Sequence, residues 1–252
     1  MAVECHATIR CVTVAIPSLG GPRMPKLLVQ QVSLDYHGFF QSPAYDLMGE
    51  GAKIMGGLAK AFSSYNVGLG NFRTEVDVNE PTANSIIVTL GQFGVYRFKF
   101  DQVQAGLRNF TSDDDIVGLV SAIEKGDAWL RSTIENFAFR SHVFVYSSHS
   151  ALSEGTSQSF FLSIPRREKP IVIGKDLGSG ILETWAEPDL GARVHLHLGH
   201  SLVQTDGIYI NYMLVFETER IDYAAVASKG RALLDRTIES IGLEFWEEEV
   251  AQ

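Results

Sequence analysis

The sequence predicts an α+β protein made of two tandem copies of one unit: a strand, an insert, three strands and a long helix. Three observations support this prediction. Several segments alternate apolar and polar residues as half-buried strands do, two long segments carry helix signals, and those two segments are similar in sequence. Two such units are expected to form an antiparallel sheet with the long helices on one face and a pseudo-twofold axis between the copies.

The first unit is expected over residues 26–138, after an N-terminal extension over residues 1–25 that contains a possible strand at 12–16. A helix is expected over 45–65, because Ser42 can cap it and Pro43 suits its first turn. Ser112 and the three aspartates that follow it start a second helix, to about residue 136, because acidic residues complement the helix dipole. The strands of this unit are expected over 26–36, 71–78, 85–90 and 95–100.

The second unit is expected over residues 139–246 and is followed by an acidic tail over 247–252. Its closing helix is expected over residues 222–241, and its insert is a polar, strand-containing stretch in place of the helix of the first unit. The strands of this unit are expected over residues 139–147, 158–164, 171–173, 181–186, 193–198 and 208–217.

The two closing helices carry the clearest sign of a duplication. Residues 125–135 align without gaps on residues 229–239, and seven of the eleven positions are identical. Chance similarity between two helices is the alternative, but Gly126 and Gly230 are among the identities and a helix interior does not favour glycine. The order of elements resembles that of duplicated, saddle-shaped α+β proteins such as the TATA-binding fold, a resemblance that assigns no role to any residue.

Composition and charge exclude several classes of protein. Hydrophobic residues make up 45% of the chain, enough for a sizeable core, which excludes a disordered or fibrous protein. The 30 acidic and 21 basic residues give a net charge of −9, which argues against nonspecific nucleic-acid binding because the phosphate backbone requires clustered Lys and Arg.

The cysteines and the N-terminus indicate the compartment. Cys5 and Cys11 are the only cysteines, too few for a disulfide scaffold and spaced unlike a zinc knuckle, so two thiols in a reducing cytosol are expected. Glu4 lies where a signal peptide requires positive charge, and no apolar run is long enough to span a bilayer. We therefore expect a cytoplasmic protein that does not enter a membrane.

A histidine cluster on a predicted strand is a candidate metal site. His195 and His197 lie two residues apart, so both point to one face, about 6.5–7 Å apart by the strand rise. His200 could complete a set for one divalent transition metal, with His142, His149 or Asp206 as a further ligand. The alternative is that the histidines occupy the polar face of an amphipathic strand.

Other residues are candidates for a ligand-binding or partner-binding surface. Gly56 and Gly57 interrupt a predicted helix, which permits close approach of a sheet, a helix or a ligand. Both phases of the strand over 139–147 are apolar, which fits a plain core, a dimer interface or an apolar ligand cleft. The remaining candidates are aromatic residues of the second unit and one compact basic cluster, namely Phe144, Tyr146, Tyr209, Tyr212, Arg166 and Arg167.

Three functional hypotheses follow. The first is a non-enzymatic protein-interaction module without a cofactor, either a subunit of a complex or a homodimer, because the chain carries a duplication and no catalytic motif. The second is a small-molecule binding protein with an apolar cleft between helices and sheet. The third is a metal-dependent enzyme that uses the cluster of His195, His197 and His200.

Overall fold

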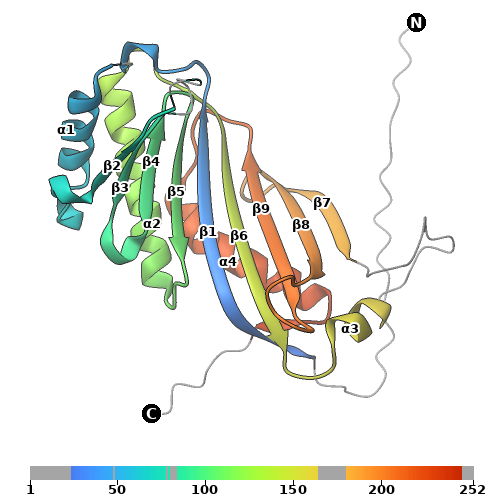
Figure 1. Ribbon diagram of the computed structural model, residues 1–252. Coiled ribbons are helices and arrows are strands. Elements are labelled where there is room, and N and C mark those ends of the chain that lie inside the picture. Colours follow the sequence, from blue (N-terminus) through green and yellow to red (C-terminus); the bar gives the residue numbers. More distant parts are fainter. Residues whose placement is uncertain (1–23, 48, 78, 80–83, 164–179, 246–252) are drawn as a thin grey trace, which may run out of the picture.

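One mixed sheet with ten strands organises the protein (Figure 1). The computed structural model describes residues 24–47, 49–77, 79, 84–163 and 180–245. Nine strands follow the order β2-β3-β4-β5-β1-β6-β9-β8-β7 with antiparallel pairing, and β10 pairs in parallel with the start of β1. The strands are β1 (Lys26–Phe40), β2 (Phe72–Glu75), β3 (Ser85–Thr89), β4 (Val95–Lys99), β5 (Gln102–Arg108), β6 (Phe139–Leu152), β7 (Ile181–Glu187), β8 (Ala192–His200), β9 (Ile208–Phe216) and β10 (Glu244–Phe245).

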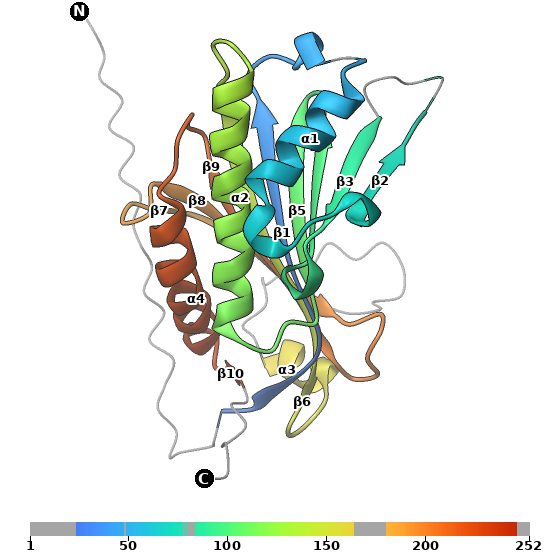
Figure 2. The ribbon, with the colours of Figure 1, turned by 90° about the vertical axis from the view of Figure 1, so that its left-hand side faces the viewer.

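The helices lie on one side of this sheet. Helices α2 (Asp113–Thr133) and α4 (Tyr223–Ser240) lie side by side across it, and α1 (Gly51–Ala61) packs beside α2 (Figure 2). The short helix α3 (Ser157–Ser163) packs at the end of the same side, where Phe161 contacts His200. No helix among the described residues covers the opposite side. The prediction of an α+β fold with long helices on one face of an antiparallel sheet is confirmed.

The strand register assigns each side chain to one of the two faces. On the face under the helices, one row crosses seven strands, and each of its side chains is at most 4% exposed. This row consists of Val88, Tyr96, Ala105, Tyr36, Phe144, Leu214 and Val194. The neighbouring row points the opposite way and defines what we call the open face; it consists of Arg73, Ile87, Arg97, Gln104, His37, Val143, Val215 and Arg193.

Local signals explain the ends of the two long helices. Ser112 caps α2, since its hydroxyl accepts a hydrogen bond from the backbone N–H of Asp115, and Asp222 caps α4 in the same way through Ala225. Each cap satisfies a backbone donor that the first turn of a helix leaves unpaired. Both helices therefore begin where the sequence predicts.

Three predictions about the elements are wrong. The helix expected over 45–65 is interrupted: Gly49 has a φ of 86°, and the N-cap position of α1 is taken by Glu50 and not by Ser42. The strand expected over 158–164 is α3, whose Phe161 is buried against His200. The first half has a fifth strand, β5, so four strands and not three precede its closing helix; the sequence analysis missed β5 although its alternate residues Val103, Ala105 and Leu107 are buried.

Several sequence predictions lie outside the described residues. They concern Cys5, Cys11, Arg166, Arg167, the possible strands at 12–16 and 171–173, and the acidic tail.

Candidate functional site

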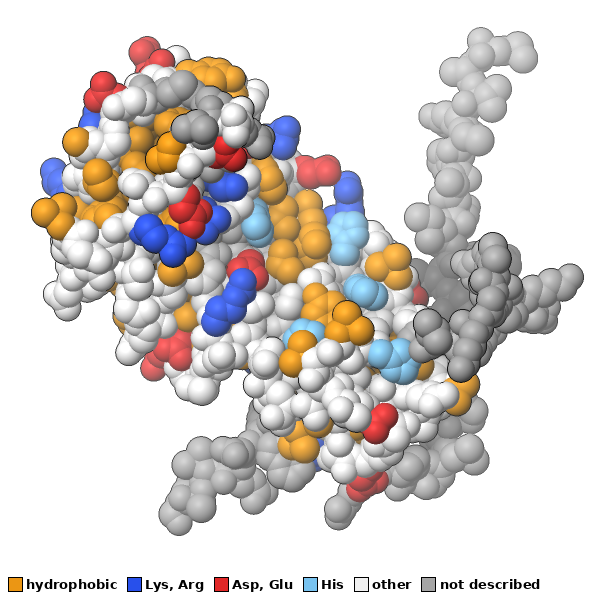
Figure 3. Space-filling view, viewed as in Figure 1, with side chains coloured by type: hydrophobic (Ala, Val, Ile, Leu, Met, Phe, Trp, Pro, Cys, Tyr) orange, Lys and Arg blue, Asp and Glu red, His pale blue; other side chains and the backbone are white. Residues whose placement is uncertain are grey.

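An apolar strip runs along the middle of the open face on β6 and β9. The register pairs Val143 with Val215 and Val145 with Met213, and all four side chains are half-buried (Figure 3). An antiparallel sheet with one wet face normally alternates apolar residues inward and polar residues outward. Here the outward phase is also apolar, so this part of the face has the composition of a contact surface.

The three clustered histidines do not share one face. His195 and His197 point to the open face of β8, where the Thr184 hydroxyl lies 3.0 Å from His195 Nδ1. His200 belongs to the opposite phase, and its Nδ1 lies 2.8 Å from the Ser157 hydroxyl on α3. Among the described residues, no group of three or more His, Cys, Asp or Glu side chains is arranged to hold a metal ion.

The residues considered as further metal ligands are also separate. His149 Nδ1 lies 2.9 Å from the Ser201 hydroxyl on the open-face side of β6. Asp206 lies in the β8–β9 loop with a left-handed φ of 55°. His142 is fully buried under the helices. These residues therefore do not complete a site with His195 and His197.

Tyr209 lies on the open face and extends the apolar strip with an aromatic ring. Its ring centroid is 4.9 Å from that of His149 and 6.0 Å from that of His197. Asn211 Nδ2 donates hydrogen bonds to the Tyr209 hydroxyl at 3.2 Å and to the Ser147 hydroxyl at 3.0 Å. This end of the open face therefore combines aromatic rings with hydroxyl and amide groups.

Basic side chains gather on the open face beyond β1. Arg97 and Lys99 lie on β4 and Arg108 lies on β5, and a hollow of about 390 Å³ opens between Arg97 and Arg108. Arg108 pairs with Asp35 at 2.8 Å, whereas Arg97 is 3.5 Å from Glu75. Sequence analysis did not single out these cations, because only the strand register shows that β4 and β5 bring them together.

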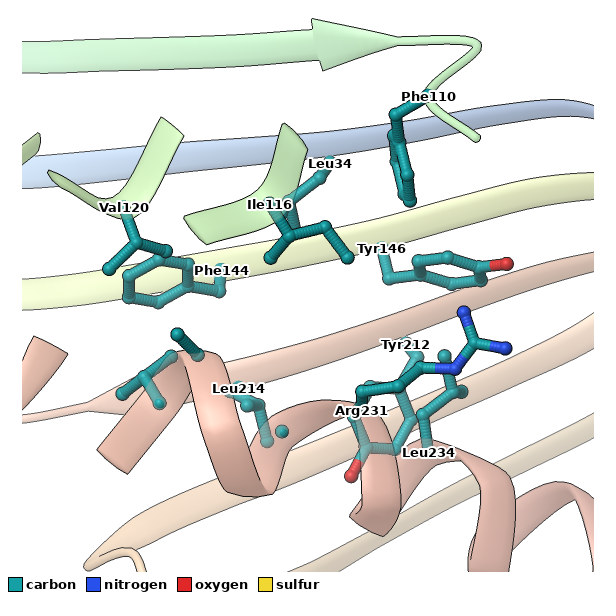
Figure 4. A pocket seen from close by; sticks show the side chains of 13 residues that line it. Leu34, Phe110, Ile116, Val120, Phe144, Tyr146, Tyr212, Leu214, Arg231 and Leu234 are labelled. Carbon is teal, nitrogen blue, oxygen red and sulfur yellow. The ribbon is translucent and has the colours of Figure 1, made fainter. Parts of the chain in front are cut away.

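A second candidate site lies under α2 and α4 (Figure 4). An apolar cavity of about 60 Å³ is lined by Phe144, Tyr146 and Tyr212 from the sheet and by Val120 and Leu234 from the helices, among others. An adjoining, more polar hollow of about 450 Å³ shares Phe110, Tyr146 and Arg231 with it. Ligand pockets usually measure about 300–1,000 Å³, so the inner cavity alone is small.

Arg231 lies between the inner cavity and the outer hollow. Its Nε donates to both oxygens of Asp235, at 2.9 and 3.2 Å, and its guanidinium lies 5.1 Å from the centroid of the Phe245 ring. Burial raises the pKa values of the Tyr146 and Tyr212 hydroxyls, so both remain protonated at neutral pH. The cleft therefore offers an apolar interior, and the two polar residues Tyr146 and Arg231 also line the outer hollow.

The two glycines singled out from the sequence have different surroundings. Gly57 packs against the indole of Trp129 on α2, so that a Cβ at this position would overlap the ring. Gly56 has no atom within 4 Å of its Cβ position. Gly57 thus serves close packing between α1 and α2, and neither glycine lines the open face or the cleft.

A buried polar network joins β1 and β6 to the loop between β9 and α4. The Tyr36 hydroxyl donates to His142 Nδ1 at 2.8 Å, and His142 Nε2 donates to the Glu219 carbonyl at 3.3 Å. Burial lowers the pKa of His142 to about 4, an effect that the Glu219 carbonyl partly opposes. The polar atoms of these groups are hydrogen-bonded to one another inside the core, so we interpret the network as structural.

Within the described ranges, no helix is both long and apolar enough to cross a membrane. No family model matches the chain, and no curated protein matches its sequence.

Proposed function

We propose that the protein is a non-enzymatic interaction module that binds a protein partner with its open face. The observation that carries this proposal is the strip formed by Val143, Val145, Met213 and Val215, which no described helix covers. Burying apolar surface contributes about 25 cal/mol per Å², so covering such a strip favours association. A contiguous apolar patch on a protein surface is typical of a contact site.

The two faces of β6 support this proposal in different ways. Phe144 and Tyr146 point to the helices and are at most 9% exposed, so the helices cover this face of β6. Val143 and Val145 occupy the opposite phase and remain half-buried. A strand that is apolar in both phases suits a sheet with both faces covered, and a bound partner would supply the second cover.

We further propose that the sheet arose from two copies of one unit, so that the open face is continuous across both. Strands β1 and β6 pair in the middle, and each half ends in a long helix. The ion pair Asp127–Arg131 on α2 aligns with the pair Arg231–Asp235 on α4, with the charges exchanged. Gly126 packs on Tyr96 of β4, and Gly230 lies near Leu214 of β9.

The test compares an altered strip with an altered helix surface. The full chain, purified untagged from its own host, is analysed by native mass spectrometry beside a Val145→Asn/Met213→Asn double variant. Val117→Asn on α2 is the control, because Val117 is 55% exposed on the helix side. We expect a complex with the wild type and the control that the double variant loses. A wild type without a bound protein, or a double variant that keeps it, would refute the proposal.

The cleft under α2 and α4 supports a second candidate function, the binding of a small apolar molecule. The supporting observation is that the apolar cavity opens into the larger hollow beside Arg231. Ala227→Phe would fill the cavity from α4. The same mass spectra test this function: an adduct below one kilodalton on the wild type that Ala227→Phe loses would support it, and a wild type without an adduct would contradict it.

A further inference from the structure

We infer that the partner of the open face is an acidic protein segment, held by the basic half of that face. This inference rests on the proposed function and adds the chemistry of the partner. The basic half is defined by Arg73, Arg97, Lys99 and Arg108, on β2, β4 and β5.

The first step is the segregation of charge. In the rows that cross β1 between Ser33 and Phe39, five basic and three acidic side chains lie on the open face, and one of the five, Arg193, pairs with Glu217 at 3.3 Å. The whole chain has the opposite balance, with a net charge of −9. An acidic partner is therefore repelled by most of the molecular surface and attracted to this face, which gives the encounter its orientation. The charged residues in these rows are Arg73, Arg97, Lys99, Arg108, Arg193, Asp35, Glu75 and Glu217.

The second step is the shape of the basic half. Gly106 contributes no side chain, and the hollow of about 390 Å³ lies over it between Arg97 and Arg108. A Cβ at Gly106 would come within 2.9 Å of Asp35 Oδ1, so a larger residue would disturb the Asp35–Arg108 pair. The hollow is wide enough to receive a side chain of the partner.

The third step is the supply of hydrogen-bond donors. Arg108 uses Nη1 for its bond to Asp35 at 2.8 Å, and a guanidinium has five N–H donors. Arg97 lies 3.5 Å from Glu75, outside the usual range for a strong charge-assisted hydrogen bond. A carboxylate in the hollow can therefore accept hydrogen bonds from both arginines without breaking an existing one.

A protein segment fits this face better than a nucleic acid does. The apolar strip of Val143, Val145, Met213 and Val215 lies on the other side of β1 from the basic half and offers no donor to phosphates. A segment that carries carboxylates for the basic half and aliphatic side chains for the strip complements both parts.

Charge reversal on β4 tests the inference. The complex from the native host is titrated with salt from about 0.05 M to about 0.5 M for the wild type and for Arg97→Glu/Lys99→Glu. Lys229→Glu/Arg236→Glu, on the exposed surface of α4, makes the same change in net charge and is the control. We expect at least a roughly tenfold loss of affinity in the β4 variant, no loss in the control, and weaker wild-type binding at high salt. Urea unfolding of each variant checks that it is folded.

The possible results separate this inference from the proposed function. A complex that tolerates both high salt and the β4 reversal, yet is lost in Val145→Asn/Met213→Asn, overturns the inference and leaves the proposed function standing. A wild type without a bound protein overturns both. Labelled poly-L-glutamate and a DNA duplex of equal charge are compared as probes: tighter binding of poly-L-glutamate supports the inference, and tighter binding of the duplex overturns it.

Discussion

Acidification is expected to destabilise the protein through His142. This imidazole is fully buried, with Nδ1 accepting from the Tyr36 hydroxyl and Nε2 donating to the Glu219 carbonyl. The network accommodates the neutral ring, because a proton on Nδ1 would face the proton of the Tyr36 hydroxyl. Burial accordingly lowers the pKa of His142 from 6.5 to about 4.

The magnitude follows from the two pKa values. Below pH 6.5 the unfolded chain binds a proton at this position, whereas the folded chain does so only near pH 4. The unfolded state thus binds more protons in this window, so the free energy of unfolding falls as the pH falls. At 1.36 kcal/mol for each pKa unit, the loss between about pH 7 and pH 4 amounts to about 3 kcal/mol. Below about pH 4, the pKa of His142 in the folded protein, this residue causes no further loss of unfolding free energy.

Urea unfolding followed by tryptophan fluorescence between about pH 4 and pH 7.5 measures this effect. His142→Gln removes the titrating group. Between about pH 7 and pH 4, the free energy of unfolding of this variant should therefore fall by about 3 kcal/mol less than that of the wild type. His197→Gln is the control, because it removes an exposed imidazole outside the buried network. If the free energy of unfolding depends on pH in the same way in the wild type and in His142→Gln, the reasoning is refuted, whatever the stability of the variant at neutral pH.

Three further predictions concern stability and can be checked by urea unfolding at neutral pH. Gly57→Ala should lower the free energy of unfolding by about 1–3 kcal/mol, because the new Cβ overlaps the Trp129 indole. Gly56→Ala has open space around it and should be neutral or stabilising. Equal effects of the two substitutions would contradict this packing. Asp222→Ala should cost about 1 kcal/mol, because α4 loses the cap on Ala225. Tyr36→Phe should cost about 1–3 kcal/mol, because His142 Nδ1 loses its buried donor, and no change would show that water replaces it.

Local signals made part of the fold predictable. The caps at Ser112 and Asp222 lie within one turn of the helices that they begin, so sequence alone located α2 and α4. Most strands with clear alternation also lie close to their predicted ranges. By contrast, α3 is short, and its helical form coincides with the burial of Phe161 against His200, a residue distant in the sequence.

The candidate site was less predictable because it depends on the register between strands. Alternation along β4 indicates that Arg97 and Lys99 face away from the core, but only the pairing of β4, β5, β1 and β6 places them on the same face of the sheet as Val143. The same limit applies to His200, which sequence spacing grouped with His195 and His197. The register points it to the other face of the sheet.

The central pairing of β1 with β6 has a consequence for the integrity of the chain. Their ladder extends from Leu27–Leu152 to Phe40–Phe139, and β10 returns from the end of the described chain to pair with Lys26 and Leu27. A chain cut between α2 and β6 would leave two fragments, each with a long unsatisfied edge strand. We expect such fragments to be insoluble apart and to reassociate when they are refolded together. The two halves would then behave as the subunits of an obligate heterodimer that happens to be encoded as one polypeptide.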